Sequence, residues 1–171
     1  MSLLFYILLV VGSGGKGRKR DMFLGKYHHS IDKKGRVILP AQFRSELDEK
    51  YIDKFVITRG FDDCLNVYPS TEWKVFAERL KALPDSDDKT RFLKRAFFSN
   101  ATESAIDKQG RLFIPGELRQ EVSISKDVMI VGGSGVIEIW AKEKWEGYNK
   151  NHGGQSFSEV AQKLHDLGIM K

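Results

Sequence analysis

Short apolar runs separated by polar turn signals occur along most of the chain. The runs at 25–31 and 36–40 are rich in β-branched and aromatic residues, and they flank the polar sequence Asp-Lys-Lys-Gly at 32–35. Two longer runs, at 54–69 and 127–141, each have a turn signal at the centre, GFDD and GGSG respectively. The pattern therefore predicts a β-turn or tight hairpin at 32–35 and two strand pairs later in the chain.

Helical periodicity follows the first strand pair and recurs near the end of the chain. A helix is predicted over 71–83, with Ser70 or Thr71 as its N-cap. A second helix is predicted over 85–99, where an acidic first turn suits the positive N-terminal end of the helix dipole. A last helix is predicted over 156–167. The first two helices would connect the two strand pairs.

Two shorter helical segments each follow a proline, at 41–47 and at 116–122. Proline suits the first turn of a helix, because the N–H that it lacks would have no intrahelical partner there. Apolar residues four positions apart in each segment lie on one helical face and are predicted to point into the core. They are Phe43, Leu47, Leu118 and Val122.

The chain is an internal duplication. Eight of the 17 positions in 31–47 recur at 106–122, where average composition would give about one identity. A second block, 56–73, aligns without a gap to 128–145. The offset between the copies is 75 residues in the first block and 72 in the second, so we place a three-residue deletion around 48–54.

The duplication divides the chain into five predicted segments. At 171 residues and 41% hydrophobic content, the chain is long enough for two small modules to share a core. We predict a non-native leader or extension at 1–21, a first repeat at 22–73, linking helices at 74–99, a second repeat at 100–145 and a C-terminal helix at 146–171.

The first 21 residues differ in composition from the rest, with an apolar run at 3–11 followed by a flexible basic run at 12–20. Nine apolar residues span about 14 Å as a helix, well short of the ~30 Å of hydrocarbon in a bilayer. A secretory signal fits poorly, because the basic residues follow the apolar run. We therefore expect Met22 to open the domain. Anchoring at a membrane surface stays open as an alternative, which deleting residues 1–21 would test.

Charge gives only a weak indication of the partner. The formal charge is +5 and the pI near 9.2, which favours a polyanionic partner. However, the basic leader accounts for +3 of this, so residues 22–171 carry +2. The single cysteine, Cys64, is predicted to be a buried filler residue, and the lack of a disulfide framework favours a reducing cytoplasm.

The polar turn of each copy combines the chemistry of a tight turn with that of an anion contact. Its glycine can adopt positive φ without steric cost, and its aspartate can accept hydrogen bonds from turn amides. Its arginine presents a planar fork that can pair with O6 and N7 of guanine, while adjacent lysines neutralise phosphates. The alternative is an arginine that only forms a salt bridge with the aspartate of its own turn. These residues are Asp32, Gly35, Arg36, Asp107, Gly110 and Arg111.

The residue patterns of metal sites and of common catalytic motifs do not stand out. His28 and His29 are adjacent, so in a strand they point to opposite faces and do not share a metal ion. The GGSG sequence at 132–135 lies between two strand-like runs, which indicates a hairpin turn and argues against a phosphate-binding loop. We therefore expect neither a metal site nor an enzyme.

Both copies resemble a known family. The tandem D-x-x-x-R motifs at 32–36 and 107–111, each followed by a short β run and a proline, resemble the MraZ family of bacterial transcriptional regulators. Each block is also similar to the wider AbrB and MazE superfamily. The resemblance covers about residues 22–147, and the tandem arrangement is much more specific than one motif alone.

The resemblance implies a mainly β fold with appended α-helices, in which two AbrB-like β-barrel repeats are related by a pseudo-twofold axis. It implies a ring-shaped homo-oligomer that binds double-stranded DNA at direct repeats upstream of the bacterial division and cell wall gene cluster. The protein would be cytoplasmic and nucleoid-associated, without a cofactor or a small-molecule substrate. The implied DNA-binding residues are Lys33, Lys34, Arg36, Lys108, Gln109 and Arg111, with Asp32, Gly35, Asp107 and Gly110 as bracing and turn residues.

Two turns and a charge of +2 are modest for a tight DNA binder. Affinity is therefore expected to come from several subunits on repeated DNA boxes, through effective concentration. The main alternative is an AbrB-fold protein-binding module like the antitoxin relatives, without specific DNA recognition. The chain has no long acidic tail of the kind that such antitoxins use, which counts against this alternative.

Overall fold

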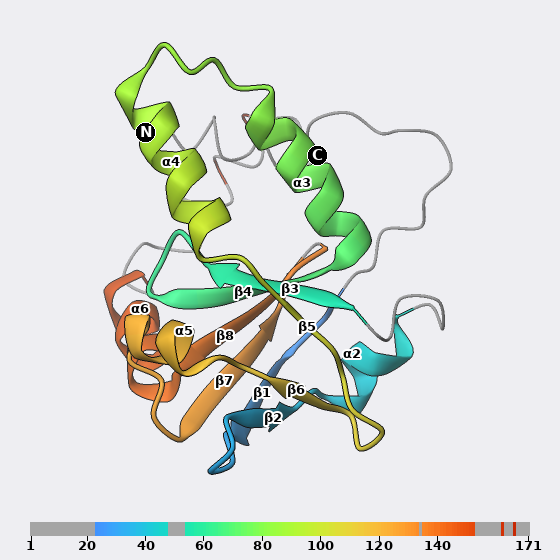
Figure 1. The fold of residues 1–171 in the computed structure, drawn as a ribbon. Helices are drawn as coiled ribbons and strands as arrows, with labels where there is room; N and C mark the ends of the chain where they lie inside the picture. The colour runs from blue at the N-terminus through green and yellow to red at the C-terminus, as the bar shows by residue number, and fades with distance from the viewer. Residues whose placement is uncertain (1–22, 48–53, 134, 153–161, 163–165, 167–171) are drawn as a thin grey trace.

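The structure is a computed structural model that describes residues 23–47, 54–133 and 135–152, together with 162 and 166 (Figure 1). Pairs of consecutive strands are each followed by one or two helices. In chain order they are β1 Lys26–Ser30, β2 Arg36–Ile38, α2 Ala41–Ser45, β3 Phe55–Arg59, β4 Cys64–Pro69, α3 Ser70–Lys81, α4 Asp88–Ser99, β5 Thr102–Ser104, β6 Arg111–Phe113, α5 Gly116–Glu121, β7 Asp127–Gly132, β8 Ile137–Ala141 and α6 Lys142–His152.

Most strands belong to one antiparallel sheet in the order β1-β7-β8-β4-β3-β5, and β2 pairs with β6 in a separate two-stranded ribbon. The prediction of a mainly β fold with appended helices is confirmed. The six-stranded sheet is open in the described part of the chain, with β1 and β5 at its edges, so the β-barrels that the family resemblance implied are not confirmed. Both predicted strand pairs are present, as β3 with β4 and β7 with β8.

The two copies exchange their first strands. β1 of the first copy pairs with β7 of the second, and β5 of the second pairs with β3 of the first. The centre of the sheet also joins the copies, through β4 and β8. If each strand is replaced by its equivalent in the other copy, the strand order is unchanged when read from the opposite edge of the sheet. Of the six strand pairings, four join one copy to the other, so the sheet is a joint product of both repeats.

The polar sequence at 32–35 forms a turn and not the start of a paired hairpin. The Gly35 N–H donates to the Asp32 carbonyl at 2.9 Å, and the Asp32 N–H donates to the Arg36 carbonyl at 2.9 Å. Beyond the turn the two strands separate, because β1 pairs with β7 and β2 with β6. Of the two predicted alternatives, the turn is confirmed and the tight hairpin is wrong.

The hydrophobic core takes side chains from both copies. The four core positions predicted after the prolines, Phe43, Leu47, Leu118 and Val122, are all buried and belong to one cluster. Burying a side chain of this size contributes about 1.5–3 kcal/mol relative to leaving it in water. Helices α2 and α5 are thereby fixed directly behind the two turns.

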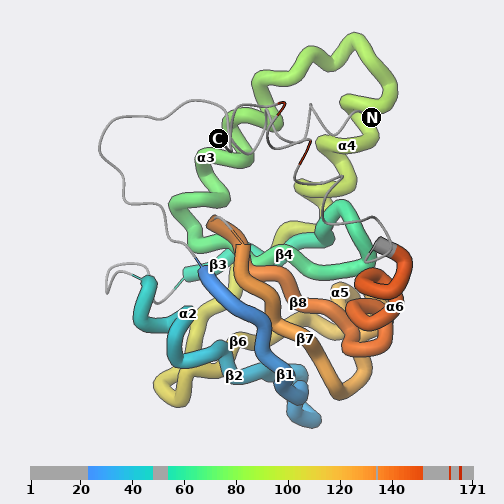
Figure 2. The backbone as a smooth tube through the Cα atoms, turned by 180° about the vertical axis from the view of Figure 1, so that it is seen from behind, coloured from blue at the N-terminus to red at the C-terminus, as the bar shows by residue number. Residues whose placement is uncertain are grey.

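Helices α3 and α4 stand at one end of the molecule, and the β2–β6 ribbon lies at the other (Figures 1 and 2). Helix α3 follows Pro69 without a side-chain cap, so the N-cap predicted at Ser70 or Thr71 is wrong. Pro69 itself occupies the N-cap position, with φ of −51° and ψ of 142°. Helix α4 begins after Asp87, whose carboxylate accepts a hydrogen bond from the Thr90 N–H at 3.1 Å.

Helix α6 begins at Lys142, inside the stretch assigned to the second repeat, and ends at His152. Trp145 of this helix packs edge-on against Trp140 of β8, with ring centroids 5.5 Å apart. The helix predicted over 156–167 and the leader at 1–21 lie outside the described residues, apart from 162 and 166.

Candidate nucleic-acid interface

The two predicted turns adopt the same hydrogen-bonded geometry. In the first, Oδ1 of Asp32 accepts the N–H groups of Lys34 and Arg36 at 2.8 and 2.9 Å. Oδ2 of the same carboxylate accepts Nε of Arg36 at 2.8 Å and Nη2 at 2.6 Å. One carboxylate therefore holds both the backbone of the turn and the guanidinium at its root.

The second turn repeats this arrangement. Oδ1 of Asp107 accepts the N–H groups of Gln109 and Arg111, both at 3.0 Å. Oδ2 accepts Nε and Nη2 of Arg111, both at 2.7 Å. In both turns the arginine forms the salt bridge that the sequence left as an alternative to DNA contact. The bridge engages one edge of the guanidinium and leaves Nη1 out of the pair.

These hydrogen bonds keep both aspartates ionised. The side-chain bond from Arg36, followed by the backbone bonds, lowers the pKa of Asp32 from 3.8 to about 2. The side-chain bond from Arg111 likewise lowers the pKa of Asp107. At neutral pH the arginine of each turn is therefore one half of an ion pair with its own aspartate.

The turn glycines are required by the backbone. Gly35 has φ of +79° and Gly110 has φ of +77°, a region that L side chains rarely adopt. The space around them is also filled by the other copy. A Cβ added at Gly110 would lie 2.9 Å from Cζ of Arg44, and one at Gly35 would lie 3.0 Å from the carbonyl oxygen of Ile114.

Hydrogen bonds between the copies hold the turns side by side. The Leu39 N–H donates to the Gly110 carbonyl at 3.0 Å, and the Ile114 N–H donates to the Gly35 carbonyl at 2.8 Å. These bonds extend the β2–β6 ribbon at both ends. Two motifs 75 residues apart in sequence thus lie on one surface.

Two further arginines border the turns, and the sequence analysis did not select them. Nε of Arg44 donates to the Leu39 carbonyl at 3.2 Å, and Nε of Arg119 donates to the Ile114 carbonyl at 3.2 Å. Each guanidinium lies against the turn glycine of the opposite copy. A signal was available, because Arg44 and Arg119 are among the eight identities between the copies. No salt bridge to either arginine is found among the described residues.

The turns differ in their third residue. Lys34 is exposed, while Gln109 at the equivalent position accepts Nη2 of Arg111 through its Oε1 at 2.8 Å. A lysine side chain cannot accept a hydrogen bond, so Arg36 forms no equivalent bond with Lys34. Lys33 in the first turn and Lys108 in the second are both exposed. The first turn therefore has one more cation and a less restrained arginine.

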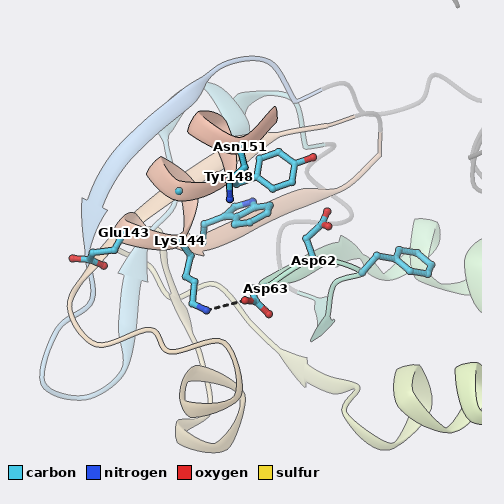
Figure 3. Close-up of a pocket in the computed structure, with 9 residues that line it drawn as sticks. Asp62, Asp63, Glu143, Lys144, Tyr148 and Asn151 are labelled. Atoms are coloured by element: carbon cyan, nitrogen blue, oxygen red, sulfur yellow. Dashed lines mark hydrogen bonds and ion pairs between the residues drawn. The ribbon is translucent and has the colours of Figure 1, made fainter. Parts of the chain in front are cut away.

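A hollow lies between the β3–β4 turn and α6 (Figure 3). It has a volume of about 460 Å³, and an ion pair between Lys144 Nζ and Asp63 Oδ2, 2.8 Å apart, spans one side of it. Close by, burial raises the pKa of Glu138, although the indole N–H of Trp140 donates to its carboxylate at 2.9 Å. These residues lie in the β3–β4 turn, on β8 and on α6, and are not part of the surface formed by the two aspartate–arginine turns.

Other predicted features have ordinary structural roles. Cys64 is buried with 2% exposure, and burial raises the pKa of its thiol, as expected for a filler residue. No cluster of metal-ligating side chains occurs among the described residues. Within the same part of the chain, no helix combines the length and apolar character needed to span a bilayer.

Comparison with known proteins finds relatives along most of the chain. The family model described as "MraZ protein, putative antitoxin-like" matches twice, over 22–96 and over 97–167. A protein named transcriptional regulator MraZ from Thermoanaerobacter sp. (strain X514) is 49% identical over 148 residues, or 86% of this chain and 100% of that protein. Its namesake from Heliobacterium modesticaldum is 46% identical with the same coverage.

Among solved structures, the solution structure of PHS018 from Pyrococcus horikoshii matches with a TM-score of 0.28 and 18% identity. The match covers 68% of this chain and 86% of that one. A likeness this low carries no weight for the fold or the site. The sequence relatives are the informative comparison.

Proposed function

The chain belongs to the MraZ family, as its tandem motifs predicted, and on that premise we propose that it is a sequence-specific DNA-binding transcriptional regulator. The name of its relatives supports a regulatory role. The observation that carries the DNA-binding part is the β2–β6 pairing between the copies, which brings the arginines of both turns to one surface. A pair of separate turns would present two weak sites, whereas the joined turns present one.

The turn arginines would read bases. The bond to aspartate fixes the guanidinium plane of each arginine. In the first turn it leaves the outer edge of Arg36 free for a bidentate contact with O6 and N7 of guanine. In the second turn Nη2 of Arg111 also donates to Gln109, so a bidentate contact there requires the Gln109 side chain to rotate away. Fixing the side chain in advance lowers the entropy lost on binding. Arg36 and Arg111 are both partly exposed, with 27% of each side chain accessible. A guanine edge can therefore reach them without rearrangement of the fold.

The remaining cations would contact the DNA backbone. Lys33, Lys34 and Lys108 are exposed on the turns, and Arg44 and Arg119 lie beside them. Such residues neutralise phosphates and fix the register of the protein on the duplex without reading sequence. Gln109 would contribute a neutral hydrogen-bonding group in the second turn.

Oligomerisation would supply the affinity that one chain lacks. The strand order is unchanged when the copies are exchanged, which supports a pseudo-twofold relation between two AbrB-like halves. Several such chains in a ring could bind direct DNA repeats at once, with a gain in effective concentration. A monomeric variant that keeps its fold is then expected to lose specific binding. Tight binding of one box by a monomer would contradict this part of the proposal.

The cellular setting follows from the same proposal. The target would be direct repeats upstream of the division and cell wall gene cluster, and the protein would act in the cytoplasm at the nucleoid. We include in it the expectation that the chain is not an enzyme. The domain boundaries predicted from the duplication, with repeats at 22–73 and 100–145, belong to this proposal as well.

A fluorescence-anisotropy titration tests the DNA-binding role. The chain is titrated with double-stranded DNA from upstream of its own gene and with a shuffled copy, at one fixed salt concentration. Arg36→Ala and Arg111→Ala are each expected to weaken binding to the native sequence by about 5- to 150-fold, the range for losing a base contact of 1–3 kcal/mol. Arg95→Ala, on α4 at the opposite end of the molecule, is the matched control.

A protein-binding module is the second candidate, and the words "antitoxin-like" in the family description favour it. The same titration separates the two functions. Equal and weak binding to native and shuffled DNA, unchanged by Arg36→Ala, would remove the DNA-reading proposal and leave protein binding as the better account. A clear preference for native DNA that depends on both arginines would remove the alternative.

A further inference from the structure

The outer face of the β2–β6 ribbon displays a pair of apolar side chains. Ile38 and Phe113 are 47% and 48% exposed, although each follows a strand residue with 0% exposure, Val37 and Leu112. They are equivalent residues of the two copies, 75 positions apart. A strand with one face in water ordinarily presents polar side chains on that face. The chain thus exposes a large apolar group at the same place twice.

Strand register sets these two residues among the turn arginines. Ile38 lies opposite Arg111, and Phe113 lies opposite Arg36. Directly opposed residues of an antiparallel pair point to the same face, with Cβ atoms about 4.5–5.5 Å apart. The four side chains therefore form a two-by-two patch, with the arginines on one diagonal and the apolar residues on the other.

This patch matches the chemistry of base edges in the DNA major groove. The groove is about 12 Å wide and admits a two-stranded β-ribbon. Guanine offers O6 and N7 to an arginine, and thymine offers its C5-methyl group to an apolar side chain. We propose that Ile38 and Phe113 are specificity-determining residues that contact thymine methyl groups beside the guanines bound by Arg36 and Arg111. The inference rests on the proposed DNA-binding function.

The distance between residues along the strand predicts how far a contacted thymine lies from a contacted guanine. Two residues along a strand advance about 6.6–6.8 Å, which equals about two base-pair steps. Each contacted thymine therefore lies within about two base pairs of a contacted guanine. The expected recognition unit is a short mixed sequence of guanine and thymine, and a site of guanine alone would bind more weakly.

Charge favours DNA over a second copy of this chain as the occupant of the patch. Arg36 and Arg111 are each paired with an aspartate, so the excess positive charge beside the patch comes from the exposed lysines of the turns, Lys33, Lys34 and Lys108. In a twofold contact between two such faces, these lysines would approach those of the other chain, and their like charges would repel. A polyanion neutralises all of these groups, so the apolar pair and the cations can be satisfied together.

The test removes the methyl group from the DNA. Deoxyuridine replaces thymine at each position in turn of the native upstream duplex, which keeps base pairing, and binding is measured by anisotropy. The wild-type chain is expected to lose about fourfold in affinity for each contacted methyl, the factor for exposing one methyl-sized group. The double variant Ile38→Ala, Phe113→Ala is expected to bind thymine DNA more weakly and to be indifferent to the replacement.

Controls separate the loss of a thymine contact from other causes of weaker binding. Thymines farther than about two base pairs from any guanine should tolerate deoxyuridine. Leu24→Ala, at a residue 58% exposed outside the ribbon, should keep the full thymine preference. Thermal unfolding and light scattering follow the fold and the oligomeric state.

Three results overturn the inference. If the double variant keeps the wild-type penalty for deoxyuridine, the methyl groups are read elsewhere. If it changes the oligomeric state, the apolar pair packs between copies of the chain. If wild-type chain prefers native over shuffled DNA but ignores deoxyuridine everywhere, the inference fails while the proposed function stands. Failure of the proposed function has a separate signature, which is equal binding to native and shuffled DNA.

Discussion

Asp32 combines two tasks in one side chain, because Oδ1 holds the turn amides and Oδ2 holds the arginine. Asp32→Asn separates them. An amide oxygen can still accept from the backbone N–H groups, but the amide nitrogen cannot accept from the guanidinium. We expect the fold to persist and Arg36 to lose its fixed orientation. Because one negative charge is also lost, binding to shuffled DNA should strengthen. The preference for native DNA should fall by about 2- to 12-fold, which corresponds to the cost of ordering one side chain on binding.

Asp107→Asn is the matched variant in the second turn, where Gln109 gives Arg111 an additional partner. Its loss of preference should therefore be smaller. Anisotropy titrations of both variants on native and shuffled DNA give the comparison. An unchanged preference in Asp32→Asn would show that the ion pair does not orient the arginine for DNA.

Acid titration gives an independent check on the same pair. The folded-state pKa of Asp32 is about 2, below the 3.8 of an unperturbed aspartate, so its ionised form is stabilised by folding. This contribution is fully present above about pH 4 and is lost as pH falls toward 2. The difference in unfolding free energy between the wild-type chain and Asp32→Asn should therefore be constant from pH 5 to 8 and should shrink between pH 4 and 2. A difference that changes mainly around pH 6–7 would contradict the assignment.

Lys34 and Gln109 offer a second test at the scale of one residue. Gln109→Lys gives the second turn the charge of the first and removes the acceptor for Arg111. We expect tighter DNA binding, with the slope of log K against log salt steeper by up to about 0.9 for each added phosphate contact. Titrations at several salt concentrations measure this slope. Lys34→Gln is the reciprocal control and should make the slope shallower by a similar amount.

At the scale of elements, the close approach of β7 to the segment before β1 depends on glycine. A Cβ at Gly132 would overlap the carbonyl oxygen of Phe23, a backbone atom that cannot rotate away. Gly132→Ala is therefore expected to destabilise the fold by about 1–3 kcal/mol, the usual cost of overpacking. Chemical denaturation measures it.

Gly147 provides the contrast within α6, because a Cβ there would meet nothing within 4 Å. Gly147→Ala should stabilise the chain by about 0.5–1 kcal/mol, since alanine is the better helix former. Equal effects of the two substitutions would show that the contact with Phe23 does not constrain β1.

Apolar runs and turn signals predicted which segments would be strands, but they could not predict the partners of β1 and β2. The run of residues is the same whether β1 continues into a hairpin or crosses to β7. The choice is made by contacts distant in sequence, such as that of Ser30 with Asp127. Helix α6 was hard to see because its face toward β8 is aromatic, with Trp145 and Tyr148, and not a repeated aliphatic stripe. The N-cap predicted at Ser70 or Thr71 was wrong because α3 already begins at Ser70, with Pro69 in the N-cap position.

At the scale of the whole molecule, the duplication indicated the residues of the candidate site but not how they assemble. Asp32 and Arg36 could be selected because Asp107 and Arg111 repeat them. The position of Arg44 beside Gly110 depends on the packing of one copy against the other, which no local pattern records. The single surface formed by both turns has the same origin. Predicting it required knowledge of the β2–β6 pairing.

Exchange of the first strands makes each repeat incomplete without the other. We therefore expect the chain to remain assembled when it is cut between the copies. A site-specific protease sequence inserted between Ser86 and Asp87, in the link between α3 and α4, would separate two fragments covalently. Four of the six strand pairings join those fragments, so they should co-elute on size exclusion under native conditions and retain binding to native DNA.

The uncut chain with the same insertion controls for effects of the added sequence. The N-terminal fragment produced alone would expose the β4 edge and the β3 edge that β8 and β5 otherwise cover. Unpaired edges of this kind promote pairing with other chains, so the lone fragment should aggregate or self-associate. Mixing it with the second fragment during refolding should restore a soluble complex and the DNA preference together. Fragments that separate without denaturant, each as a folded monomer, would show that the copies are independent domains and would remove the structural basis for a shared DNA-binding surface.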